Sequence, residues 1–177
     1  MTNEKNNIKN LTLAALCLAI AMLLPFLTAQ IQTIGNMLCP MHIPVLLCAY
    51  ICGWKWAAMV GFMAPILRYF AFGMPPLMPI GWGMAFEMLT YGLVAGILYS
   101  MLPKKTVNIY VSLIISMIAG RIVWGIARMV IAGVTKTQFT WQLFVGGAFL
   151  EAIPGIILHI ILIPIIVVAL RKAKLIE

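Results

Sequence analysis

The chain has 177 residues, of which 64% are hydrophobic and only 9% are charged, with a formal net charge of +8 at pH 7. Together with a mean hydropathy of +1.08, this composition lies far outside the range of soluble domains and predicts an all-α integral membrane protein. A membrane-spanning helix needs roughly 20 apolar residues, so six of them leave no room for a soluble catalytic or nucleotide-binding domain. The basic residues lie mostly at the ends of apolar segments, where membrane topology explains them, so nucleic acid is excluded as a partner.

The first apolar run follows the polar leader MTNEKNNIKN and lacks an A-x-A-like cleavage site. We therefore expect a retained helix over residues 11–31 and no signal peptide. Within it, Ala15 and Ala19 form an A-x-x-x-A pattern, a spacing that lets two helices approach closely. Packing within the chain is the favoured explanation of the pattern, but Ala14 and Ala21 add small residues on other faces, so the helix could also accept a partner helix.

Five further apolar runs follow, so we expect one membrane domain of six spans. The predicted spans are 11–31, 38–53, 54–72, 79–101, 107–133 and 142–170. The second is short and contains two prolines. In the fourth, Gly92 and Gly96 form G-x-x-x-G, for which packing inside the chain is the favoured explanation.

The basic residues predict the orientation. With the amino terminus inside, the outer loops contain only Lys136, and the inner segments contain Lys5, Lys9, Lys55, Lys104, Lys105, Arg171, Lys172 and Lys174. By the positive-inside rule, both termini are therefore expected in the cytoplasm.

The four cysteines form no C-x-x-C pair, and three of them lie within or beside apolar runs; the four are Cys17, Cys39, Cys48 and Cys52. We expect neither a disulfide nor a metal site, and no cofactor. The string CPMH at 39–42 contains a cysteine and a histidine, but two such residues without partners at zinc spacing are a weak signal.

Charged residues inside apolar runs are costly and indicate function. At about 1.5 Å per residue, Arg68 falls near the outer end of its helix and Arg128 about 8 Å below the outer end of its own. Arg121 lies two turns below Arg128 on the same face. Glu87 and Glu151 fall roughly 12 to 14 Å below the outer ends of their helices. For any single Arg–Glu pair, a purely structural ion pair that locks the bundle is as good an explanation as a functional one. Three arginines against two glutamates, however, leave one positive charge, which suits an outer pocket for a substrate with one carboxylate or phosphate.

Other candidates for this pocket have stronger structural explanations. Trp124 and Tyr91 could line a cavity, although packing aromatics are commoner. His42 adds a titratable group near the outer end of the second span, while His159 is expected at the opposite depth. Asn36 lies in an uncharged connection that suits either a lid or an ordinary re-entrant loop, and the proline-rich segment 72–79 suits a rigid pocket wall beside Arg68.

Several longer strings resemble the substrate-binding S components of energy-coupling factor (ECF) transporters, the vitamin importers of bacteria. The strings are MHIPVLLCAYICGWKW at 41–56, FGMPPLMP at 72–79, GMAFEMLTYGLVAG at 83–96, GRIVWG at 120–125 and EAIPGIILHIILIP at 151–164. The alanine-rich first helix, the chain length and the six spans agree with this family, and the pantothenate-type branch is the most similar.

The resemblance implies a multi-pass protein of the bacterial cell membrane that binds a vitamin or vitamin precursor from outside. The protein would release it inside in complex with a transmembrane coupling subunit and two ATPases, with Ala15 and Ala19 as the docking surface. Pantothenate has one carboxylate, which agrees with the surplus positive charge.

Two other classes of protein compete with this interpretation. An intramembrane enzyme is disfavoured because the chain has no H-E-x-x-H and no G-x-S-x-G motif, and no P-loop is present to hydrolyse ATP. A structural or assembly membrane protein of six spans remains an alternative, but it does not explain the surplus arginine. An S component for another vitamin also remains open, because the strings that carry the resemblance indicate the fold and not the substrate.

Overall fold

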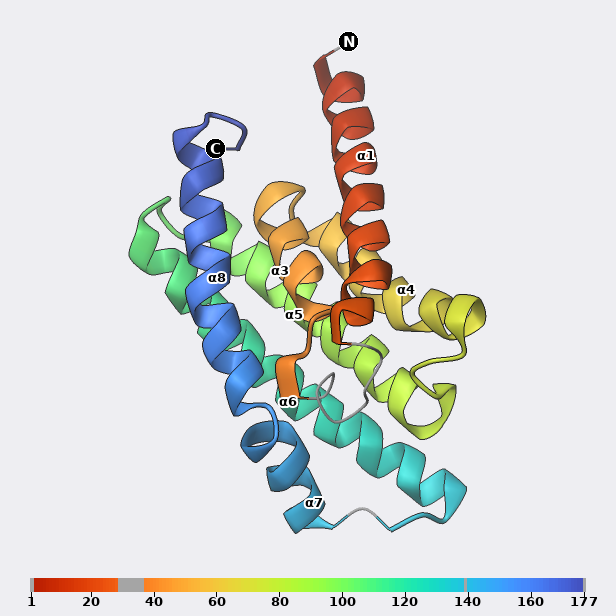
Figure 1. The fold of residues 1–177 in the computed structure, drawn as a ribbon. Coiled ribbons are helices and arrows are strands. Elements are labelled where there is room, and N and C mark those ends of the chain that lie inside the picture. The colour runs from red at the N-terminus through yellow and green to blue at the C-terminus, as the bar shows by residue number, and fades with distance from the viewer. Residues whose placement is uncertain (1, 29–36, 139, 177) are drawn as a thin grey trace.

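A computed structural model of the chain describes residues 2–28, 37–138 and 140–176, and these residues form helices and their connections (Figure 1). The predicted all-α membrane fold is confirmed. Among the described residues, four helical segments are long and apolar enough to cross a membrane: Asn7–Phe26, Leu77–Met101, Thr106–Thr135 and Ile153–Lys172.

The helices follow the predicted apolar runs. Their bounds are α1 Thr2–Leu23, with a 3₁₀ turn η1 at Leu24–Thr28, α3 His42–Ile51, α4 Trp54–Phe72, a π-turn η2 at Leu77–Gly81, α5 Trp82–Met101, α6 Thr106–Thr135, α7 Trp141–Val145, a π-turn η3 at Gly146–Leu150, and α8 Ile153–Lys172. At about 1.5 Å per residue, α3 is too short to cross a bilayer by itself, in keeping with the short second run.

The last run departs from the expectation of one continuous span over 142–170. Two successive glycines open the π-turn η3, two turn residues follow, and α8 begins only at Ile153, directly before Pro154. Glycine weakens a helix, and proline is accommodated best in its first turn, so the chain changes direction between α7 and α8. Because of this break, Glu151 lies in a turn before α8 and not inside the continuous helix that the sequence predicts.

Helix α5 lies between α4 and α6, and its contacts with these two helices are the most extensive in the molecule. A Cβ added at Gly92 would lie 2.5 Å from the backbone of Ala57, and one at Gly96 would lie 2.5 Å from Cα of Trp54. The G-x-x-x-G pattern therefore serves close packing of α5 on α4, which confirms the expected packing within the chain.

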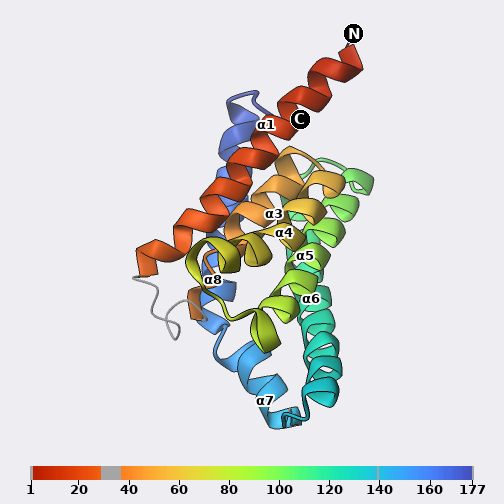
Figure 2. The same cartoon turned by 90° about the vertical axis from the view of Figure 1, so that its right-hand side faces the viewer.

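The two chain ends lie at the same end of the bundle, together with the turn between α5 and α6 (Figures 1 and 2). The connection from α6 to α7 lies at the opposite end. The polar cluster described next lies between these two ends, where α3, α5, α6 and α8 meet.

Candidate functional site

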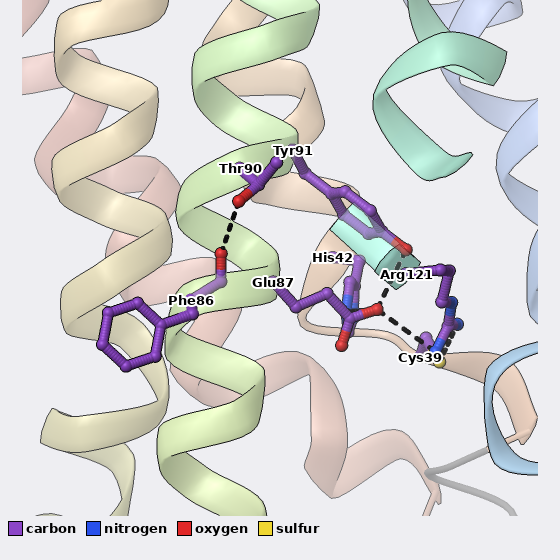
Figure 3. A network of polar contacts seen from close by, with 7 residues as sticks. All are labelled: Cys39, His42, Phe86, Glu87, Thr90, Tyr91 and Arg121. Carbon is purple, nitrogen blue, oxygen red and sulfur yellow. Dashed lines mark hydrogen bonds and ion pairs between the residues drawn. The ribbon is translucent and has the colours of Figure 1, made fainter. Parts of the chain in front are cut away.

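A buried ion pair occupies the centre of the candidate site (Figure 3). Arg121 Nη1 lies 3.1 Å from Glu87 Oε1, and both side chains are almost fully enclosed. The hydroxyl of Tyr91 donates a hydrogen bond of 2.9 Å to the same carboxylate oxygen. An ionised carboxylate is tolerated in such a place because an opposite charge and a donor both stabilise it.

Local sequence explains how this group assembles. Glu87 and Tyr91 are four residues apart on α5, so they lie on the same face and can bond to each other. A Cβ at Gly120 would lie 2.0 Å from the Tyr91 ring and 3.1 Å from the carbonyl oxygen of Glu87. Only a residue without a side chain leaves room for that ring, and the next residue, Arg121, then meets Glu87. The first glycine of GRIVWG thus permits the contact that the arginine makes.

Histidines from two other helices complete the cluster. His42, the first residue of α3, places Nε2 3.7 Å from Glu87 Oε1, and its ring centroid lies 5.3 Å from that of Tyr91. His159 of α8 lies with its ring centroid 6.1 Å from that of His42. The expectation that the two histidines lie at opposite depths is therefore wrong, because the break before α8 shifts the position of His159 along the bundle.

These imidazoles have hydrogen-bonding capacity to spare. His42 and His159 are 2% and 1% exposed. Within the described residues, three of their ring nitrogens have no hydrogen-bond partner: Nδ1 and Nε2 of His42 and Nε2 of His159. A buried polar atom without a partner costs about 1 to 3 kcal/mol, so each of these atoms favours the arrival of a hydrogen-bonding group.

Cys39 provides a further contact. Arg121 Nη2 lies 3.6 Å from Cys39 Sγ, and Cys39 adopts a positive φ of 47° just before α3. The CPMH string thus places both its cysteine and its histidine in the cluster. Among the described residues, no group of three or more His, Cys, Asp or Glu side chains could hold a metal ion.

Arg128 and Trp124 form the part of the site that lies towards the carboxyl-terminal end of α6. The guanidinium carbon of Arg128 lies 5.8 Å from the centre of the Trp124 ring. That ring stacks on Phe144, with 6.3 Å between the two ring centroids. A Cβ at Gly83 would lie 3.1 Å from Cδ of Arg128, and one at Gly125 would lie 2.3 Å from the Phe144 ring. Small residues therefore make room for both side chains, and Arg128 lies two turns from Arg121 on the same helix.

Arg68, a predicted site residue, has its contacts elsewhere. Its Nη1 donates to the carbonyl oxygen of Met22 at the end of α1, and its guanidinium carbon lies 5.1 Å and 5.3 Å from the ring centres of Phe26 and Phe72. A cation at a helix carboxyl terminus is favourable, and aromatic faces attract it further. Arg68 therefore ties the end of α1 to the end of α4.

The remaining predicted residues lie apart from the cluster or outside the described chain. Glu151 is exposed in the turn before α8, and Arg121 pairs with Glu87 instead. Asn36 lies outside the described residues. Sequence reasoning missed the contribution of His159, although an ionisable residue in the middle of the apolar segment IPGIILHIILIP is itself a functional signal.

The predicted docking residues lie on the surface of α1. Ala15 and Ala19 are exposed, whereas Ala14 and Ala21 are buried against the bundle. The alanine-rich helix therefore uses one set of small residues for packing within the chain and leaves the other uncovered.

Comparison with known proteins agrees with this architecture. The sequence matches the family described as "ECF transporter, substrate-specific component" over residues 9–167, almost the whole chain. Neither the curated proteins nor the solved structures gave a match. S components are substrate-binding, non-catalytic, multi-pass subunits of the cell membrane that generally pair with a coupling module. The chain belongs to the family of substrate-specific components of ECF transporters.

Proposed function

We propose that this S component captures a small anionic vitamin or vitamin precursor, and that the buried cluster around Glu87 and Arg121 forms the floor of its binding site. The observation that carries the proposal is the pair of nearly inaccessible histidines beside a buried ion pair: Nδ1 and Nε2 of His42 and Nε2 of His159 have no hydrogen-bond partner among the described residues. Binding sites combine apolar walls with a few convergent polar groups of this kind. A purely structural bundle gains nothing from such unsatisfied groups.

The charge balance favours an anion. Arg68, Arg121 and Arg128 bring three positive charges into the bundle against the buried carboxylate of Glu87, since Glu151 is exposed. Glu87 neutralises Arg121, and Arg68 contacts a carbonyl and two rings. Arg128 is the proposed anion contact because its planar guanidinium can donate two parallel hydrogen bonds to a carboxylate. Pantothenate is the substrate we propose to test first, since it combines one carboxylate with hydroxyl and amide groups.

The two histidines suit the uncharged part of the same ligand. A neutral imidazole has one donor and one acceptor nitrogen, so His42 and His159 together can both donate to and accept from a hydroxyl or amide. His159→Phe keeps a ring of similar size but removes both nitrogens. We expect this variant to bind pantothenate at least tenfold more weakly while its thermal stability is unchanged or raised.

The proposed assembly follows from the surface of α1. Ala15 and Ala19 would contact the transmembrane coupling subunit, which in turn would recruit two ATPase subunits. Small side chains let two helix backbones approach closely, and both residues are exposed in the isolated chain. With both termini in the cytoplasm, the end that contains the α6–α7 connection would face outward and admit the vitamin.

Calorimetric titration of the purified chain tests the anion contact. We expect wild type to bind pantothenate more tightly than pantothenamide, which lacks the negative charge. Arg128→Gln should weaken pantothenate binding by about 1.5 to 3 kcal/mol, the value of a hydrogen bond to a charged group, and should bind both compounds alike. Lys136→Gln is the matched control, because this exposed residue follows α6 directly and should leave both affinities unchanged.

Two results would contradict the proposal. Equal binding of the acid and its amide by wild type would show that the arginines do not recognise charge. Binding of a neutral or cationic vitamin in place of pantothenate would give the pocket a different chemistry.

A further inference from the structure

Two cationic side chains from distant parts of the sequence lie against one aromatic ring at the end of the bundle that contains the chain ends. Lys104 follows α5, and Arg171 lies in the last turn of α8. Lys104 Nζ lies 3.8 Å from the centre of the Tyr99 ring, and the guanidinium carbon of Arg171 lies 5.6 Å from the same centre. Arg171 Nη2 also donates a hydrogen bond of 2.8 Å to the carbonyl oxygen of Lys104.

The ring that these cations share is held in place. Tyr99 is 4% exposed and makes an edge-to-face contact with Tyr50 at 4.9 Å. Tyr50 is anchored in turn, since its hydroxyl lies 3.0 Å from Ser112 Oγ and 3.2 Å from the carbonyl oxygen of Ile109. The two charges are therefore presented by a rigid platform that joins α3, α5 and α6, and the contact with Arg171 adds α8.

The charges at this end are strongly unbalanced. Lys105, Lys172 and Lys174 are near neighbours of the pair in the sequence, which makes five basic residues on the α5–α6 turn and the end of α8. From residue 99 to residue 177 the sequence has two acidic residues: Glu151, which precedes α8 at the far end of that helix, and Glu177, the last residue of the sequence. Like charges gathered on one small surface repel one another, so an anion that binds between them is stabilised by several cations at once.

The surroundings indicate what kind of anion. The cluster lies where membrane-length helices end, which is the level of phospholipid phosphates. Large apolar side chains are exposed beside it, with Met101 at 76%, Val107 at 67% and Leu175 at 58%. A soluble phosphate would use only the cations, whereas a phospholipid would use the cations for its headgroup and the apolar side chains for its acyl chains.

We propose that the α5–α6 turn and the end of α8 form a binding site for the headgroup of an anionic phospholipid, held by Lys104 and Arg171, which the Tyr99 ring positions. The lipid joins the last helix to the centre of the bundle at the end away from the vitamin. This site is independent of the substrate and of its chemistry.

Native mass spectrometry of the detergent-purified full-length chain tests the proposal, with phosphatidylglycerol and phosphatidylcholine of identical acyl chains as probes. We expect wild type to bind phosphatidylglycerol at least tenfold more tightly than phosphatidylcholine. The double variant Lys104→Gln/Arg171→Gln should lose this preference. The matched control is Lys9→Gln/Lys55→Gln, which removes two basic residues from α1 and α4 outside the cluster and should retain it.

A second variant guards against a folding defect in the first. Lys105→Gln/Lys172→Gln leaves Tyr99 and its two cations intact, and we expect an intermediate loss of preference of about threefold to fivefold, with an unchanged melting temperature. Glycerol phosphate, which has the headgroup charge without acyl chains, should not displace the lipid at a hundredfold excess.

Three outcomes would overturn the proposal. Equal binding of the two lipids by wild type would show that there is no anion site. An equal loss in the Lys9/Lys55 control would show that only the total charge matters. Displacement by glycerol phosphate would identify a site for free phosphates.

Discussion

The buried ion pair between Glu87 and Arg121 makes the strongest prediction about stability. Glu87→Gln keeps the shape of the side chain and one oxygen that can accept from Tyr91, but it removes the negative charge. Arg121 is only 7% exposed and has that carboxylate 3.1 Å away. Removing one partner of a buried pair leaves the other charge uncompensated, which costs about 3 to 5 kcal/mol.

This cost translates into a measurable shift in melting temperature. For a soluble chain of 150 to 250 residues, 1 kcal/mol shifts the midpoint by about 2 to 4 °C, so we expect a fall of roughly 6 to 20 °C. Tryptophan fluorescence during heating in detergent reports the transition, since the chain has five tryptophans. Replacing both Glu87 and Arg121 by Gln should cost less than the sum of the two single changes, because the double variant leaves no charge stranded.

The control uses the other glutamate that the sequence singled out. Glu151→Gln removes the same charge from an exposed turn and should change stability by less than about 0.5 kcal/mol. Equal shifts for Glu87→Gln and Glu151→Gln would refute the reasoning. Additive effects of the two single variants at Glu87 and Arg121 would refute it as well, since independent sites show no coupling.

Three further predictions concern packing, docking and topology. Gly120→Ala should destabilise the chain by about 1 to 3 kcal/mol in the same melting assay, because its Cβ would lie 2.0 Å from the Tyr91 ring. Gly133→Ala on the same helix is the control: its Cβ would have no neighbour within 4 Å, so this variant should be neutral or stabilising. Ala15→Trp should abolish vitamin uptake by cells while calorimetry still detects ligand binding by the isolated chain; loss of both would indicate that this alanine packs inside the bundle. In a background without native cysteines, a cysteine at Lys136 should react with an impermeant maleimide on intact cells and one at Lys105 should not; the reverse pattern would invert the orientation.

The sequence by itself determined the class of the protein and the positions of most of its helices. Hydropathy depends on composition along the chain, so the run 54–72 predicted a helix with the bounds that α4 has, Trp54 to Phe72. Helical periodicity also placed Glu87 beside Tyr91, because residues four apart on a helix lie on one face. These properties are local, and local sequence is sufficient to read them.

The tertiary structure decided which charges meet. From the sequence, Arg121 could pair with either glutamate, and the break at Gly146 and Gly147 settles the choice by leaving Glu151 exposed. The same break brings His159 close to His42, which a depth count along one straight helix could not foresee. A count along one helix gives position along its axis, whereas contacts between helices also depend on rotation, tilt and close approach. Those are set by side-chain packing between segments far apart in the sequence, such as the Tyr91 ring over Gly120.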